Sequence, residues 1–95
     1  MSLETKIREQ MRLTLLRHLD ANTPRALEEG YLLQSVRADG FNASGMEVFA
    51  ELSYLADKGV VISEPKLISP ENHAWRITAA GRDYYAALAN KNRDE

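Results

Sequence analysis

The sequence predicts an α+β fold that is mostly helical, with a three-helix core, a β-hairpin and a C-terminal helix. Three observations predict it: a strongly capped helix over residues 44–58, two β-rich runs after that helix, and a striped helix near the N-terminus. The 95 residues, 44% hydrophobic and 27% charged, suit one globular domain. We expect that domain over residues 1–90 and a charged, frayed tail over residues 91–95.

The capped helix begins with Ser44, which precedes Glu47 by three residues. This spacing predicts a capping box, in which the serine hydroxyl and the glutamate carboxylate each accept a hydrogen bond from the other residue's backbone amide. Apolar residues follow at helical spacing at Val48, Leu52 and Leu55. Lys58 suits the C-terminus of this helix, and Gly59 suits the position just beyond it.

A β-hairpin is predicted after this helix. Residues 60–63 are short and β-branched, and residues 73–77 can pair back with Trp75 and Ile77 on one face. The polar connection is too long for a two-residue turn, and its residues 66–68 either extend the strands or form the tip. A lone tryptophan here could stack on a base, but packing on the core is the better explanation.

The N-terminal helix is predicted over residues 2–20. Its apolar stripe recurs every four residues, at Leu3, Ile7, Met11, Leu15 and Leu19. Burial in the core explains this stripe; the alternative is that the first turns of the helix dock on another subunit.

The middle of the chain is predicted to hold two further helical segments. Thr23 before Pro24 suits the start of a short helical turn over residues 25–27. Gly30 interrupts the chain, and residues 31–39 form the second helix of the core. The last helix of the chain starts after Thr78, as its N-cap, and runs from residue 79 to about residue 90.

The order helix, hairpin, helix resembles the second half of a winged helix domain. The residues that carry the resemblance are Leu52, Leu55, the runs Lys58–Val61 and Trp75–Thr78, and Gly81–Arg82. The resemblance implies a winged helix-turn-helix fold in which the Ser44–Lys58 helix is the recognition helix. It says little about the molecular role, because one fold hosts many functions.

A second resemblance is narrower. The phrases Glu29–Tyr31, Gly40–Ser44 and Arg76–Arg82, together with the order of elements, are similar to small winged helix proteins of Mu-like phages and prophages. This similarity implies a phage-encoded protein that acts in the bacterial cytoplasm.

The sequence favours no enzymatic activity, metal or cofactor. It has no cysteine, and its two histidines, His18 and His73, stand far apart without a ligand cluster. Ser44 has a structural role as a cap, and no glycine-rich phosphate loop is present. No apolar run reaches membrane-spanning length, and we expect a cytoplasmic protein that binds no membrane.

Charge divides the chain unevenly. Residues 28–64, which include the helix-turn-helix, contain two basic and seven acidic residues, a net charge of −5. The predicted outer face of the recognition helix carries Met46, Glu47, Ala50, Tyr54 and Asp57, with Glu51 and Lys58 at its edge. No Arg, Asn or Gln is there to read a base edge, so this surface opposes DNA binding by the helix itself; an ordinary solvated face also explains it.

DNA contacts could instead come from other elements. The candidates are Lys66, His73 and Arg76 on the hairpin and Arg12 and Arg17 on the first helix. The main prediction is therefore a DNA-binding, non-enzymatic winged helix protein, a phage-type transcriptional regulator or accessory factor. Solubility alone also explains the charges on the hairpin.

The alternative is a protein-interaction module on the same scaffold that binds no DNA. Tyr54 and Glu51 are its candidate contact residues. We also expect a homodimer with a two-helix seam across a twofold axis, formed by the stripe of the first helix and one face of the last helix. The residues of this seam are Leu3, Ile7 and Met11 of the first helix and Tyr84, Ala87 and Leu88 of the last.

Overall fold

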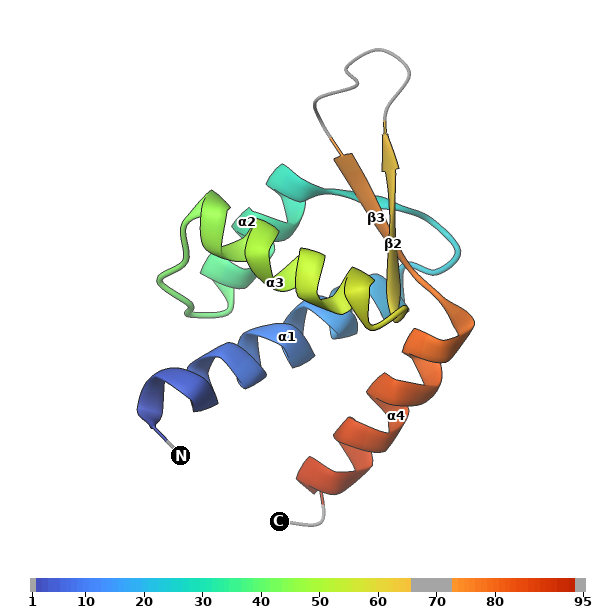
Figure 1. The fold of residues 1–95 in the computed structure, drawn as a ribbon. Coiled ribbons are helices and arrows are strands. Elements are labelled where there is room, and N and C mark those ends of the chain that lie inside the picture. The colour runs from blue at the N-terminus through green and yellow to red at the C-terminus, as the bar shows by residue number, and fades with distance from the viewer. Residues whose placement is uncertain (1, 66–72, 94–95) are drawn as a thin grey trace.

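The computed structural model describes residues 2–65 and 73–93. The elements follow in the order α1 (Leu3–Ala21), β1 (Leu27–Glu28), α2 (Glu29–Ala38), α3 (Gly45–Asp57), β2 (Val61–Pro65), β3 (His73–Ile77) and α4 (Ala79–Arg93). Figure 1 shows α1 crossing beneath α3, the β2–β3 hairpin projecting from the helices, and α4 closing the base. This order and arrangement are those of the winged helix fold predicted from the sequence.

The three strands form one antiparallel sheet in the order β1-β3-β2. In the hairpin, Val61 is paired with Ile77 and Ser63 with Trp75. On the other edge of β3, Leu27 is paired with Trp75. The predicted helical turn over residues 25–27 is therefore wrong, because the free edge of β3 offers backbone hydrogen bonds that an isolated turn does not have.

The core lies where α1, α2 and α3 meet the inner face of the sheet. Its completely buried side chains are Leu15, Leu16, Leu19, Leu32, Val36, Val48, Leu52 and Leu55. Trp75 and Ile77 both face this core, so the prediction that they share a buried face is confirmed.

Local signals decide where α3 begins and ends. Ser44 is the N-cap, and both hydrogen bonds of the predicted capping box with Glu47 are present. Lys58 is the C-cap, and Gly59 follows with a φ of 77°, a conformation that favours glycine. The chain then passes close to α4, because a Cβ on Gly81 would collide with the backbone oxygen of Val60.

Several boundaries differ from the predicted ones. Helix α2 starts at Glu29, so Gly30 lies within its first turn instead of interrupting the chain. Its hydrogen bonds outweigh the cost of a glycine at this position. Helix α4 continues to Arg93, three residues beyond the predicted end. The predicted hairpin tip over residues 66–68 lies outside the described residues.

Candidate nucleic-acid interface

The outer face of α3 is apolar and acidic. Met46 is 84% exposed, and Phe49 and Tyr54 are about half exposed. Glu47, Ala50 and Asp57 are exposed beside them, as predicted. The 13 residues of α3 include no Arg, Lys, His, Asn or Gln, so the helix has none of the side chains that most often recognise adenine or guanine.

The edge of α3 that faces α1 is held by charge. Arg12 Nε donates a hydrogen bond to Glu51 Oε1 at 2.5 Å, and the guanidinium lies 4.0 Å from the centre of the Tyr54 ring. Glu51 is thereby buried, although the sequence predicted it at the exposed edge. Arg12, predicted to contact DNA, therefore contacts Glu51 and Tyr54, which were predicted to contact a protein partner. Because the Arg12 guanidinium lies between a carboxylate and an aromatic ring, it is poorly placed to bind phosphate.

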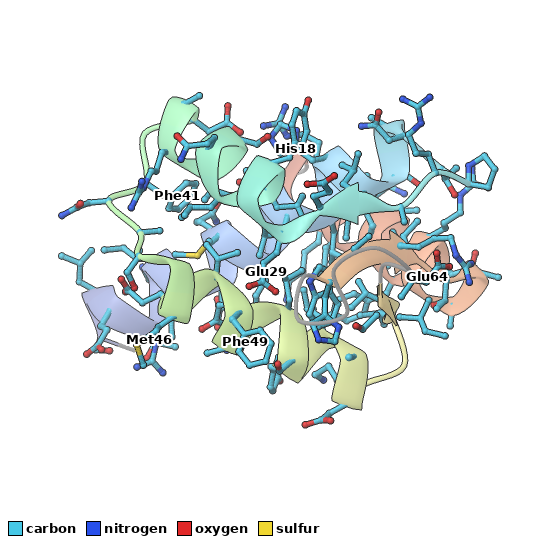
Figure 2. All side chains as sticks on the ribbon, turned by 90° about the horizontal axis from the view of Figure 1, so that it is seen from above. His18, Glu29, Phe41, Met46, Phe49 and Glu64 are labelled. Carbon is cyan, nitrogen blue, oxygen red and sulfur yellow. The ribbon has the colours of Figure 1, made fainter. Side chains whose placement is uncertain are left out.

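The other edge of α3, which faces the hairpin, is held by aromatic packing. The Phe49 and Trp75 rings meet edge to face, with their centres 6.3 Å apart. Trp75 Nε1 donates to Glu29 Oε1 at 3.0 Å, so the buried indole has a polar partner. In Figure 2, Glu29 and Phe49 lie on the same side of the molecule, beside the hairpin. Trp75 is thus a packing residue that connects α2, α3 and β3, and it is not free to stack on a base.

The hairpin carries two of the predicted DNA-binding residues within the described chain. Arg76 Nε donates to Glu64 Oε1 at 2.8 Å across the two strands. His73 Nδ1 forms a 2.7 Å hydrogen bond with the Ser63 hydroxyl. Arg76 remains partly exposed, so a phosphate could displace its carboxylate partner. Lys66 lies outside the described residues.

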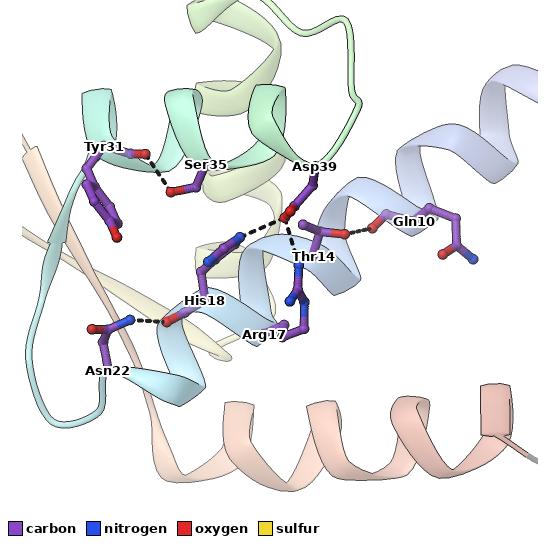
Figure 3. Close-up of polar contacts among 8 residues, drawn as sticks. All are labelled: Gln10, Thr14, Arg17, His18, Asn22, Tyr31, Ser35 and Asp39. Atoms are coloured by element: carbon purple, nitrogen blue, oxygen red, sulfur yellow. Dashed lines mark hydrogen bonds and ion pairs between the residues drawn. The ribbon is translucent and has the colours of Figure 1, made fainter.

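Arg17 lies where α1 meets the end of α2, beside His18 and Asp39 (Figure 3). Its Nη2 is 2.7 Å from Asp39 Oδ2, and the same oxygen accepts a 2.8 Å hydrogen bond from His18 Nε2. The His18 hydrogen bond, followed by the Arg17 charge, lowers the pKa of Asp39 below its ordinary value of 3.8, although desolvation acts in the opposite direction.

Intramolecular ion pairs occupy most of the described arginines. Their pairs are Arg8–Glu4, Arg12–Glu51, Arg17–Asp39, Arg76–Glu64 and Arg82–Asp20. Phosphate binding depends on cations whose charge is not already balanced by a neighbouring carboxylate. The sequence could not show this pairing, because in four of the five pairs the partners belong to different elements.

The remaining predicted contact residues, Leu3 and Ile7, lie on the N-terminal half of α1 and line a groove against α3. Among the described residues, no group of three or more His, Cys, Asp or Glu side chains could hold a metal ion. In the same part of the chain, no helix combines the length and apolar character required to span a bilayer.

Several solved structures resemble this fold. A proposed transcriptional regulator, TA0346 from Thermoplasma acidophilum, matches 98% of this chain and 93% of its own, with a TM-score of 0.74 and 22% identity. A mutant of MepR from a multidrug-resistant S. aureus clinical isolate matches 90% of this chain, with a TM-score of 0.70 and 14% identity. Another S. aureus MepR mutant matches 96%, with a TM-score of 0.71 and 13% identity.

These comparisons confirm the winged helix fold. The chain spans 64% and 68% of the two MepR chains, about two thirds of their length. No protein-family model and no curated protein matches the sequence. The similarity to Mu-like phage proteins finds no support in these matches and stays a prediction.

Proposed function

We propose that this chain is a DNA-binding winged helix protein of the transcription-regulator type, without enzymatic activity. The observation that carries the proposal is the match of almost the entire chain to a proposed transcriptional regulator of nearly the same extent. The finer predictions of a Mu-like phage origin, a cytoplasmic location and a homodimer belong to this proposal.

The hairpin is the best candidate for contact with the DNA backbone. Arg76 and His73 are both half-buried residues of β3, in the hairpin whose far end extends beyond the helices (Figure 1). Lys66 follows β2 in the sequence and would add a second basic side chain to that of Arg76. Helix α3 offers apolar contacts, for example from Met46 or Phe49 to thymine methyl groups, and exposed carboxylates such as Asp57, which can accept from cytosine but are repelled by phosphate. Affinity would therefore come mainly from phosphate contacts of the hairpin, with little discrimination between sequences.

Fluorescence anisotropy of a labelled random-sequence duplex tests this proposal. We expect micromolar binding at low salt that weakens steeply as salt rises, because phosphate contacts release counterions. Arg76→Glu should weaken binding by at least about tenfold, since it removes a cation and adds a repelled carboxylate. No binding at low salt would contradict the proposal.

The matched control is Arg82→Glu. Arg82 is also paired with a carboxylate, Asp20, at 3.2 Å, but it lies on α4, which packs against α1. Its reversal changes the net charge of the protein by the same amount as the Arg76 variant. We expect the Arg82 variant to bind within about twofold of the wild type, since only local phosphate contacts matter at moderate salt. Equal losses in both variants would mean that net charge, and not the hairpin, controls binding.

A protein-interaction module is the second candidate function. The specific observation in its favour is the exposed Met46 and Phe49 pair on a helix surrounded by acidic residues. Met46→Lys tests it well, because Met46 is the most exposed large apolar side chain in the described chain. Loss of a captured partner with unchanged DNA affinity would favour this function. Glu51→Lys is a poor test, because the new cation would face Arg12 in a buried site.

A further inference from the structure

The N-terminal half of α1 projects beyond the core. Residues 2–10 are all exposed, whereas Met11, which continues the same apolar stripe, is buried. Leu3 is 74% exposed and Ile7 46%. The local side-chain contacts of this segment include the Ser2 cap, the hydrogen bond between the Ser2 and Thr5 hydroxyls and the exposed Glu4–Arg8 pair at 3.0 Å. Because short isolated helices are marginal in water, a packing partner would stabilise these turns substantially.

An apolar groove of about 930 Å³ runs along this segment. One wall is the stripe of α1, and the other is the turn from α2 to α3 with the first turns of α3. Figure 1 shows the N-terminal half of α1 extending beneath that turn. The apolar members of the lining are Leu3, Ile7, Met11, Phe41 and Ala50.

We propose that a second copy of this chain covers the groove by inserting its own Leu3 and Ile7, an inference that rests on the homodimer of the proposed function and assigns its interface. The surface provides both the protruding side chains and the groove that receives them. That combination is what an isologous interface about a twofold axis requires, since each copy must contribute the same patch. Leu3 and Ile7 themselves line the groove, so in such a dimer each copy would cover the apolar wall of the other.

The charges along the groove also suit a second copy. Its charged lining residues are Glu4 and Arg8 on α1, one turn apart, and Glu47 and Glu51 on α3. Glu47 accepts from the Ser44 amide and Glu51 from Arg12, so Glu4 and Arg8 are the charges that face outward along α1. Two α1 helices that cross antiparallel near Lys6 bring Glu4 of each copy toward Arg8 of the other. Opposite charges then face each other twice, whereas a groove of one sign would favour a partner of the opposite sign.

This interface differs from the seam predicted from the sequence. Tyr84 and Leu88 of α4 line a separate groove with Glu9 and Leu13, on the other side of α1. The proposed interface instead includes Glu47, Ala50 and Glu51 of α3. Self-association would therefore bury the N-terminal end of α3. It would also fix the position of α3 relative to α3 of the second copy.

Sedimentation equilibrium without DNA tests the proposal independently of DNA binding. We expect the wild type to sediment at twice its 10.7 kDa chain mass. Ile7→Glu should raise the dimer dissociation constant by at least about 100-fold, because each dimer buries two unpaired carboxylates. The matched control is Ile62→Glu, since Ile62 is 43% exposed on β2 and does not line the groove. A monomeric wild type, or equal effects of both variants, would overturn the proposal.

A second pair of variants tests whether α3 forms part of the interface. Ala50→Arg places a long cation in the groove wall, while Met46→Arg places it on the outer face of the same helix, outside the groove. We expect only the Ala50 variant to dissociate the dimer. If Ala50→Arg dimerises as the wild type does, the groove is not covered and the proposal is wrong. Circular dichroism of each variant confirms that helix content is kept.

Discussion

The two edges of α3 are held by different chemistry. On the hairpin side, Phe49 meets the buried ring of Trp75. On the α1 side, Arg12 bridges Glu51 and Tyr54. Burial of large aromatic surface stabilises a fold strongly, whereas the attraction within a buried ion pair is largely offset by the loss of hydration. The hairpin edge should therefore supply stability, and the α1 edge should mainly specify where α3 sits.

The largest effect is expected at the aromatic edge. Trp75→Ala should lower the free energy of unfolding by about 3–5 kcal/mol, because it leaves a cavity among α2, α3 and β3. Urea unfolding followed by circular dichroism measures this, since Trp75 is the sole tryptophan and its fluorescence is lost. Trp75→Phe keeps a ring against Phe49 but removes the bond to Glu29, and should cost clearly less. If both variants lose the same free energy of unfolding, the Trp75–Glu29 hydrogen bond, and not the packing of the ring, supplies the stability.

The charged edge should give the next largest effect. Arg12→Ala leaves the buried Glu51 carboxylate without its cation and should cost about 2 kcal/mol. Adding Glu51→Leu to that variant should recover most of the loss, since the pair itself contributes little net stability. Arg8→Ala, which breaks the exposed pair with Glu4, is the control and should change stability by less than about 0.5 kcal/mol. A double variant as unstable as Arg12→Ala would contradict this view of the α1 edge.

The partner ring at the aromatic edge should matter less than the buried indole. Phe49→Ala should cost about 1 kcal/mol, because Phe49 is half exposed and loses one edge-to-face contact. Met46→Ala, on the same helix but almost completely exposed, should be close to neutral. The comparison uses thermal unfolding of the two variants in one buffer. If the two variants are equally stable, the Phe49–Trp75 contact does not hold α3.

The smallest effect concerns a contact on neither edge, the Arg17, His18 and Asp39 cluster. The folded-state pKa of Asp39 lies below its ordinary value of 3.8, so its stabilising contribution is present above that pH. The contribution is lost as the pH falls through the lowered pKa. Asp39→Asn should therefore be less stable than the wild type at pH 6, with the difference vanishing as both are acidified below pH 3.8. A difference that does not change with pH would mean that the Asp39 charge has no part in it.

The sequence predicted most of the elements that carry the fold. The Ser44 capping box, the paired strand over residues 73–77 and the inward face of Trp75 are all confirmed. These features depend on contacts within a few residues or on a regular period of apolar side chains, both of which can be read directly. The short strand β1 was missed, because two residues have no period and pair only when β3 is in place.

The candidate site was less predictable. The sequence showed the acidic character of α3, and that composition is a property of the chain alone. It did not show that Arg12 contacts Glu51, 39 residues away, or that Arg76 forms an ion pair with Glu64. Which cations remain available to a phosphate depends on those distant partners.

The sequence by itself determined the winged helix order, the caps and the lack of Arg, Asn or Gln on α3, because each is set by local chemistry or composition. Only the tertiary structure decided which arginines are neutralised and which face of α1 stays open. Both outcomes depend on how the helices pack, since a side chain finds an ion-pair partner or a cavity only after distant segments have met.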